Sequence, residues 1–282
     1  MIQLPDSRLL VDQAARYFLV RLLASNSEYQ VSRSISSLGQ YLNRQATIDD
    51  LTGETVSRWL EWLEQKMAKR TVAGHRTNIL SIWRHLAEEG IVQAPRQVRR
   101  IAKPDPCPVA WTIDELKALI EQAAQVKTHM SDGTPMSTYW LATIYTAYET
   151  GLRKSDLWRV SLSQIRDDGS IHSLRQHKTG RTHQPRVTQR TLGLLRQIRH
   201  DPPLAWIGAH TRQWYIKWNL LVAAARIRPG ALQQIRRTGA THLYREHPED
   251  VQRYLGHRTP TMQKHYVDLS LAAPQVNMPP EL

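Results

Sequence analysis

Apolar side chains in the first hundred residues recur every three to four positions, which is the spacing of helices that bury one face. A first helix is predicted by the stripe Val11, Ala14, Ala15, Phe18 and Leu22. A second helix is predicted from about residue 27 to residue 43. The run Asp49-Asp50-Leu51-Thr52 is typical of a helix entrance. The helix that follows is predicted by a stripe of Val56, Trp59, Leu60 and Leu63.

A fourth helix is predicted from a cap at Thr71 to a stop at Gly90, because glycine commonly follows the last helical residue. Its inward positions are Val72, Ile79, Ile82, Trp83 and Leu86. Tryptophans at such positions are expected to be core residues and not platforms for DNA bases. The other sides of this helix carry Arg70, His75, Arg76, Asn78 and Arg84.

The helical pattern breaks between Arg99 and Trp111, where three prolines follow Lys103. Proline removes a backbone donor and restricts the residue before it, so this stretch cannot continue a helix. The capping box Thr112-Ile113-Asp114-Glu115 then begins a new helix. We therefore expect a helical domain at residues 1–102, a proline-rich linker at 103–111 and a second domain at 112–282.

The second domain mixes helical and extended patterns. A helix is predicted from about residue 137 to residue 150, ending at Gly151, and short extended segments are predicted at 162–165, 171–175 and 184–188. Asp168-Gly169 and Thr179-Gly180 are turn signals between them. Helices are expected again from residue 191 through Tyr266, the last of them carrying this tyrosine. The predicted fold class is mostly α with a small antiparallel β-sheet.

The net charge of the chain predicts the kind of partner that it binds. The 282 residues include 38 Lys and Arg against 25 Asp and Glu, a formal net charge of +13 that is spread along the chain. Such a surface attracts polyanions, of which nucleic acid is the commonest inside cells, although a merely solvated basic surface is the alternative. Cys107 is the only cysteine, which excludes an internal disulfide. With no signal-peptide pattern and no apolar run of membrane-spanning length, we expect a soluble intracellular protein.

Four short motifs in the second domain combine helix ends or turns with side chains that bind phosphate. They are Thr150-Gly151-Leu152-Arg153-Lys154-Ser155-Asp156, His177-Lys178-Thr179-Gly180-Arg181, Gln233-Gln234-Ile235-Arg236-Arg237-Thr238-Gly239-Ala240-Thr241-His242, and the run from Tyr254 through Gly256-His257 to Tyr266. Each has an ordinary interpretation by itself: a surface ion pair, a solvated turn, a packed helix and a helix–loop–helix. Their meaning depends on their order along the chain.

Together and in this order, the four motifs resemble the tyrosine recombinase (phage integrase) family. Arg153 matches the family's first arginine within Thr-Gly-Leu-Arg, and Lys178 matches its hairpin lysine. Arg236 matches the second arginine, His257 lies in a Leu-Gly-His motif, and Tyr266 follows at the family's separation. The resemblance covers the whole second domain, and the N-terminal helices also resemble the family's core-binding domain.

The resemblance implies a mechanism and a set of roles. Tyr266 would attack a DNA phosphodiester and form a 3′-phosphotyrosyl link, releasing a 5′-hydroxyl. Arg153 and Arg236 would bind the nonbridging oxygens, and Lys178 would protonate the leaving oxygen. His257 would hydrogen-bond the phosphate or help to take the tyrosine proton. We expect Asp156 to support these groups.

One position departs from the family pattern, because Gln233 occupies the place of the first histidine in His-x-x-Arg. An amide can donate a hydrogen bond to phosphate, but it cannot carry a proton near neutral pH as imidazole can. Slower chemistry is therefore expected. No metal or cofactor is implied. A zinc site at His172, His177 and His183 is disfavoured, because no carboxylate or thiolate lies at ligand spacing, and these histidines are expected to face DNA or solvent.

The resemblance also implies partners: double-stranded DNA clamped by two lobes, a homotetramer on paired sites, and accessory proteins. Additional DNA contacts are expected from Arg70, His75, Arg76, Arg84, Arg181 and Arg237. A cytoplasmic, nucleoid-associated location fits this activity. Two alternatives stay open: a type IB topoisomerase, which rejoins the original strand, and a DNA-binding accessory protein that has lost catalysis. Gln233 is the one feature that favours the accessory protein.

Overall fold

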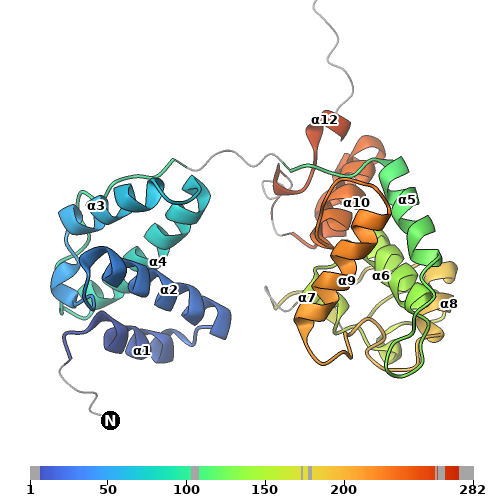
Figure 1. Cartoon of the computed structure of the whole chain (residues 1–282), viewed down its shortest axis with the longest axis horizontal. Helices are drawn as coiled ribbons and strands as arrows, with labels where there is room; N and C mark the ends of the chain where they lie inside the picture. Colours follow the sequence, from blue (N-terminus) through green and yellow to red (C-terminus); the bar gives the residue numbers. More distant parts are fainter. Residues whose placement is uncertain are drawn as a thin grey trace, which may run out of the picture. The chain divides into compact units, whose positions relative to one another are not determined.

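The computed structural model describes residues 7–102, 108–172, 174–176, 180–257, 259 and 264–272. The chain forms two compact units that divide between residues 105 and 106 (Figure 1). Both units are mainly helical, and the second also contains a small antiparallel sheet, which confirms the predicted fold class. Over the described ranges, none of the helices combines the length and the apolar character needed to cross a membrane.

The first unit is a bundle of four helices. They are α1 (Leu10–Arg21), α2 (Ser25–Leu42), α3 (Gly53–Glu64) and α4 (Lys69–Glu88), with a 3-10 turn η1 (Ile48–Asp50) before α3. Helix α4 contacts each of the other three helices, so it is the centre of this unit. The inward residues predicted for α3 are all fully buried: Val56, Trp59, Leu60 and Leu63.

Helix α1 is where predicted, but its buried face only partly matches the predicted one. Leu10, Ala14 and Tyr17 are buried, whereas Val11 is 50% exposed and Leu22 is 88% exposed. Of the predicted stripe, Ala14 is buried and Phe18 packs against the core, so the buried face overlaps the predicted one but is centred on Leu10, Ala14 and Tyr17. The reason is tertiary, because the Tyr17 ring packs against the ring of His85 on α4, with centroids 5.1 Å apart.

Helix α4 begins earlier than predicted. Ala68 precedes its first residue, and the backbone carbonyl of Ala68 accepts from the amides of Thr71 and Val72. Thr71 is therefore inside the first turn and is not the cap. At the other end, Gly90 has φ +73, which confirms the predicted stop, because this left-handed conformation favours glycine.

The second unit contains eight helices with two 3-10 turns among its described residues. They are α5 (Ile113–Ala124), α6 (Met136–Thr150), α7 (Lys154–Leu157), η2 (Leu162–Gln164), α8 (Gln189–Arg196), α9 (Thr211–Ala224), α10 (Gln233–Glu246), η3 (Pro248–Asp250), α11 (Val251–Leu255) and α12 (Leu269–Ala272). Helix α6 contacts α5, α7, α8 and α10, so this helix organises the unit. The helix predicted at 137–150 is thereby confirmed.

Aromatic side chains fill the core beside α6. Trp140 packs edge-on against Trp214, with centroids 5.6 Å apart, and Trp214 stacks on Trp218 at 5.5 Å. Trp111, predicted to end the linker, is fully buried and its ring stacks on that of Trp218. Its neighbour Ala110, also predicted in the linker, is fully buried too. These two residues therefore belong to the second unit, because the bulky indole gains more from burial than from exposure in a linker. The capping box of Thr112 with Glu115 is confirmed.

The sheet consists of β1 (Leu174–Arg175) and β2 (Thr182–His183), antiparallel, with Leu174 opposite His183. Single bridges between Ile165 and Ile171 and between Ser170 and Arg186 continue the pairing. Of the extended segment predicted at 162–165, Leu162–Gln164 form the turn η2 and only Ile165 is extended. The conformation of η2 follows from a capping box, in which the side chains of Ser161 and Gln164 bond to each other's backbone.

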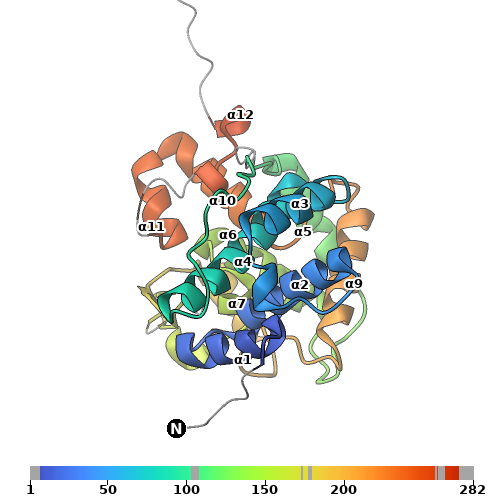
Figure 2. The same cartoon turned by 90° about the vertical axis from the view of Figure 1, so that its left-hand side faces the viewer.

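The last helices gather around α10. Helix α10 contacts α11, α12 and η3, and Figure 2 shows these segments side by side at one end of the unit. Their contacts enclose a small apolar core of Ala240, Val251, Leu255, Val267 and Ala272. Tyr266, expected on a helix, lies in a turn before α12. The end of α11 at Gly256, with φ +60, is as predicted.

Candidate active site

Arg153 lies at a turn between two helices. Helix α6 ends at Thr150, Gly151 adopts φ +59, and Arg153 precedes the first residue of α7. The glycine permits the left-handed turn that lets the chain reverse after α6. Arg153 is partly exposed, and its Nη1 donates to Oε1 of Gln176 on the hairpin at 3.3 Å. The first arginine is thus held between α7 and the hairpin.

Arg236 lies on α10 and is fully buried. Its Nη1 donates to the carbonyl of Gly151, and its Nη2 donates to the carbonyl of Leu255 at 2.8 Å. These carbonyls belong to the two turns that precede Arg153 and His257. One guanidinium therefore ties both turns to α10, which explains why so large a polar group is buried here.

The charge of Arg236 is only partly satisfied by these bonds. Its Nε is buried without a hydrogen-bond partner among the described residues. Burial, followed by the nearby Arg153 charge, lowers the pKa of Arg236 to about 10. A guanidinium that is buried beside a second cation and keeps a free donor favours the binding of an anion, because the anion neutralises the charge and accepts the hydrogen bond. The arrangement fits a phosphate oxygen.

His257 lies between Arg236 and Tyr266. Its Nε2 is 3.3 Å from Nη2 of Arg236, and its ring centroid is 4.9 Å from that of Tyr266. Arginine can only donate, so Nε2 accepts, and the neutral ring carries its proton on Nδ1. This Nδ1 is buried and has no partner within the described ranges. His257 therefore offers a second unused donor.

The protonation state of His257 follows from its surroundings. Burial, and then the charges of Arg236 and Arg153, lower the pKa of His257 to about 4. The ring is thus neutral near pH 7. Tyr266 is partly exposed, and Cζ of Arg236 lies 4.8 Å from the centre of its ring. The phenol is accessible to a substrate and lies beside His257 and Arg236.

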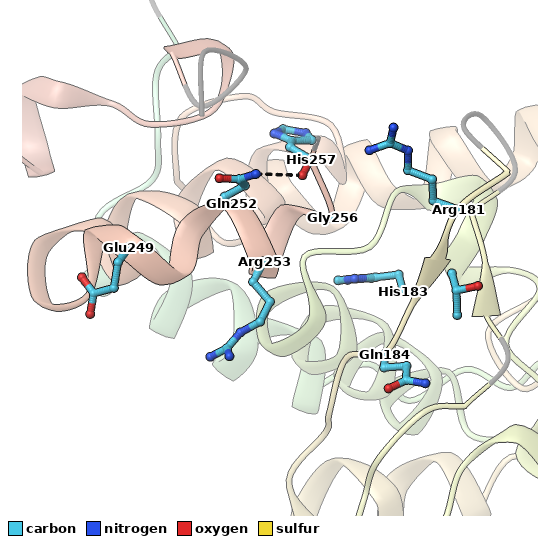
Figure 3. A pocket seen from close by; sticks show the side chains of 9 residues that line it. Arg181, His183, Gln184, Glu249, Gln252, Arg253, Gly256 and His257 are labelled. Carbon is cyan, nitrogen blue, oxygen red and sulfur yellow. Dashed lines mark hydrogen bonds between the residues drawn. The ribbon is translucent and has the colours of Figure 1, made fainter. Parts of the chain in front are cut away.

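A cavity of about 680 Å³ opens beside this group of residues, between the hairpin and α11. Residues of the hairpin and of the segment 249–257 line it: Arg181, Thr182, His183, Gln184, Glu249, Gln252, Arg253, Gly256 and His257. In Figure 3, His183 points into the cavity from β2, and the Gln252 side chain bonds to the backbone oxygen of His257. Arg181 is exposed on the hairpin side, where it can reach a polyanion.

His183 differs from the sequence-based expectation. It was expected to face DNA or solvent, but only 9% of it is exposed. Burial lowers its pKa, hydrogen bonding to the Thr150 backbone raises it, and the nearby Arg236 lowers it further. The one available signal was its position, because in a strand it shares the inward face with Leu174 and Pro185. His172 is half-buried, and its Nε2 lies 2.8 Å from Oγ of Ser170.

The other predicted site residues are placed as follows. Gln233 is the first residue of α10, one helical turn before Arg236, and is partly exposed. Asp156 is buried on α7, within electrostatic reach of Arg236. Arg237 is half-buried on α10. Lys178 and His177 lie outside the described residues.

In the first unit, α4 carries the predicted DNA contacts. Arg70 and Arg84 are exposed nearly four turns apart, so they share one side of the helix. Arg76 is partly buried, and its Nε donates to the Arg99 carbonyl at 2.7 Å. Partial burial and the charges of Arg84 and Arg100 lower the pKa of Arg76. These arginines form a cationic surface.

His75 does not belong to that surface, and its prediction as a DNA contact is wrong. The residue is 8% exposed, its Nδ1 is 3.0 Å from Oγ of Ser34, and its ring packs edge-on against Trp59. Burial lowers its pKa, so the ring is neutral. A satisfied core histidine cannot contact phosphate.

Metal-ligating side chains converge at one place among the described residues, His247, Glu249 and Asp250 near η3. His247 and Glu249 are exposed, and Asp250 already pairs with Arg253 at 2.7 Å. The group is an acidic surface turn with its own cation. It holds no residue of the predicted catalytic set.

Gly151 provides a test of the turn that positions Arg153. A Cβ at this residue would lie 2.7 Å from the Tyr254 ring, and φ is positive. We expect Gly151→Ala to lower the free energy of unfolding by about 1–3 kcal/mol, measured by denaturant titration. Gly193→Ala on α8, where a Cβ meets nothing within 4 Å, is the control, and it should stabilise by about 0.5–1 kcal/mol. Equal effects of the two changes would contradict the assigned strain.

The fold and the site define a class of protein: a mainly helical domain that brings together two arginines, a histidine and a tyrosine. The family model described as "Phage integrase family" matches residues 111–272, more than half of the chain. The chain therefore belongs to the phage integrase family. A search of curated proteins gives no match.

Solved structures share the fold at low sequence identity. A lambda integrase tetramer bound to a Holliday junction has a TM-score of 0.70 and 18% identity, over 98% of this chain and 81% of that chain. The Tn1549 transposon integrase with a circular intermediate DNA has a TM-score of 0.67 and 14% identity, over 93% and 95%. The XerH site-specific recombinase bound to difH has a TM-score of 0.68 and 13% identity, over 91% and 81%.

Proposed function

We propose that this protein is a site-specific DNA recombinase that cleaves and rejoins strands through a 3′-phosphotyrosyl intermediate. The observation that carries the proposal is the convergence of Arg236, His257 and Tyr266, two of which keep buried donors without partners in the described part of the chain. Family membership supports the same reaction. The phenolic oxygen of Tyr266 attacks phosphorus, and its proton passes to solvent, which reaches the partly exposed side chain. The bond to the 5′ oxygen breaks, and the phosphotyrosyl link keeps the energy of the phosphodiester.

The two arginines stabilise the transition state. Negative charge grows on the nonbridging oxygens as Tyr266 attacks. Arg236 offers its free Nε–H, and the bonds to two backbone carbonyls keep the guanidinium from turning away. Arg153, on the facing turn, is held at one Nη by Gln176 and has other donors for the second oxygen. Little reorganisation is needed when substrate arrives.

The proton transfers are assigned from what each group can do. His257 is neutral and accepts from Arg236 at Nε2, so it donates to the phosphate from Nδ1. Lys178, which the family resemblance matches to the hairpin lysine, protonates the leaving 5′ oxygen. Gln233 contributes at most an amide donor, which predicts slower chemistry than an imidazole would allow. Asp156 balances part of the charge of Arg236.

The substrate and the assembly follow from charge and family. Double-stranded DNA is the partner of a chain with a net charge of +13, and the exposed Arg70, Arg84 and Arg181 contact its backbone. The lambda integrase relative forms a tetramer on a junction, and we extend that assembly on paired sites to this chain. Its place of action is then the DNA of the cytoplasm, with accessory proteins where direction must be set.

Covalent capture tests the function. The protein is incubated with nicked DNA fragments from its own source and denatured, and the attached DNA is sequenced. We expect attachment at 3′ ends that cluster at one sequence. Attachment scattered over all sequences would instead identify a type IB topoisomerase. Tight, salt-sensitive binding without any attachment would make the Gln233 departure decisive and favour an accessory protein.

A further inference from the structure

The hairpin places two buried polar side chains at the active site, and the proposed mechanism gives neither a full role. Gln176 is 1% exposed and His183 is 9% exposed. Both lie on the inward face of the hairpin, where Leu174 and Pro185 are also buried. Burying polar groups is costly unless they bond to something, so an inward face of a two-stranded sheet would ordinarily be apolar. The position of these residues therefore calls for a reason.

Both side chains contact the turn that carries His257. A Cβ on Gly256 would overlap Nε2 of Gln176 and would lie 3.2 Å from Nδ1 of His183. Gly256 also has φ +60, so the residue is a glycine for two reasons. The close approach fixes the backbone just before His257 against β1 and β2.

The same two side chains contact the turn that carries Arg153. Gln176 accepts from Nη1 of Arg153 at 3.3 Å, and His183 bonds to the backbone of Thr150, at the end of α6. Each hairpin residue thus touches both active-site turns, one before Arg153 and one before His257. Arg236 ties these two turns together from the side of α10.

A neutral imidazole suits this place better than a cation does. His183 lies near Arg153 and Arg236, with Asp156 as the nearby acid. A lysine or arginine here would add a third positive charge beside Arg153 and the buried Arg236. An aliphatic residue would lose the bond to Thr150. Imidazole fills the space, donates to the backbone and stays uncharged near neutral pH.

We propose that His183 and Gln176 are positioning residues, which hold Arg153 and His257 in the geometry that binds the scissile phosphate and align both with the hairpin. The inference rests on the proposed function. The family resemblance assigns a role to the hairpin lysine and none to these two positions. Because they act through other residues, their loss slows strand cleavage and leaves DNA affinity nearly unchanged, since the exposed arginines that bind the backbone stay in place.

The test compares two variants of His183 in the full chain. Single-turnover cleavage is measured on a nicked duplex carrying the captured sequence, together with DNA affinity by titration. His183→Leu should cleave on the order of tenfold to a hundredfold more slowly, as misplacement of catalytic groups predicts, with affinity unchanged within about twofold. His183→Asn keeps an N–H close to the position of Nδ1 and should recover most of the lost rate. A merely space-filling role would give the opposite order.

Gln176 supplies an independent test should His183→Leu fail to fold. Gln176→Met has a similar length and removes the acceptor of Arg153, so the cleavage rate should fall while affinity holds. His172→Leu is the matched control, because His172 lies near the hairpin outside the site, and its rate should equal that of the wild type. Wild-type cleavage rates in all variants would overturn the positioning roles of His183 and Gln176 and would leave the proposed function intact. Absence of covalent attachment in the wild type would overturn the proposed function itself.

Discussion

Replacing Tyr266 with phenylalanine is expected to abolish covalent attachment to DNA. Phenylalanine keeps the ring that packs against His257 and Arg236 and removes only the oxygen that attacks phosphorus. No second hydroxyl is assigned to this step, so the cleavage rate should fall by about 10³-fold or more. The measurement is denaturing electrophoresis of protein with labelled nicked DNA, with affinity determined in parallel. DNA binding should be retained, because the cationic side chains are untouched.

Tyr254→Phe is the matched control for this experiment. The Tyr254 hydroxyl donates to the backbone carbonyl of Tyr148 at 2.6 Å, which leaves it unsuited to attack DNA. Burial raises the pKa of Tyr254, which also argues against a phenolate. The variant should lose about 1–2 kcal/mol of stability and still form the covalent complex. Attachment that persists in Tyr266→Phe and disappears in Tyr254→Phe would reassign the nucleophile.

Replacing Arg236 with lysine is expected to have the second largest effect. Lysine retains the charge but has one nitrogen, which cannot reach the carbonyls of Gly151 and Leu255 and also donate to phosphate. Cleavage should slow by about 10²–10³-fold, the usual loss when one transition-state donor is removed. The unfolding free energy should fall by about 1–3 kcal/mol, because a buried carbonyl loses a charged donor. Quench-flow cleavage and denaturant titration measure the two effects.

Arg153→Lys separates the catalytic effect from the structural one. Arg153 is partly exposed and makes one hydrogen bond to Gln176 in the described part of the chain, so its change should cost less than about 1 kcal/mol of stability. The cleavage rate should nevertheless fall about as far as in Arg236→Lys, because the second nonbridging oxygen of the phosphate loses its forked donor. If Arg236→Lys were stable and fully active, the two-arginine assignment would be untenable.

The elements of the fold follow closely from local signals. The α3 stripe, the Thr112 capping box and the glycine at the end of α6 each depend on residues within a few positions, and each is found as predicted. The face of α1 was misjudged because two overlapping stripes have similar hydrophobicity. Contact between Tyr17 and His85 on α4 decides between them, and no local pattern contains that information.

Histidines show the limit of reading a site from sequence. His75 and His183 both sit among polar or basic neighbours and were expected near DNA, yet both are buried. His75 is satisfied by Ser34, a bond across 41 positions, and His183 is held near Thr150 by the folding of the hairpin. A histidine can donate, accept or pack, so only its tertiary neighbours determine which of these it does.

The sequence by itself determined the family, the basic charge that predicts a polyanionic partner, and the candidates for the reactive groups, because motif order and charge are properties of the chain. The tertiary structure alone decided their states. Only folding buries Arg236 where it binds the carbonyls of two distant turns. Only folding buries His257 beside Arg236 and Arg153, and this burial, followed by the two charges, lowers the pKa of His257 to about 4. The physical reason is that desolvation and hydrogen-bond geometry depend on neighbours brought together from α6, α10, α11 and the hairpin. A one-dimensional pattern does not specify those neighbours.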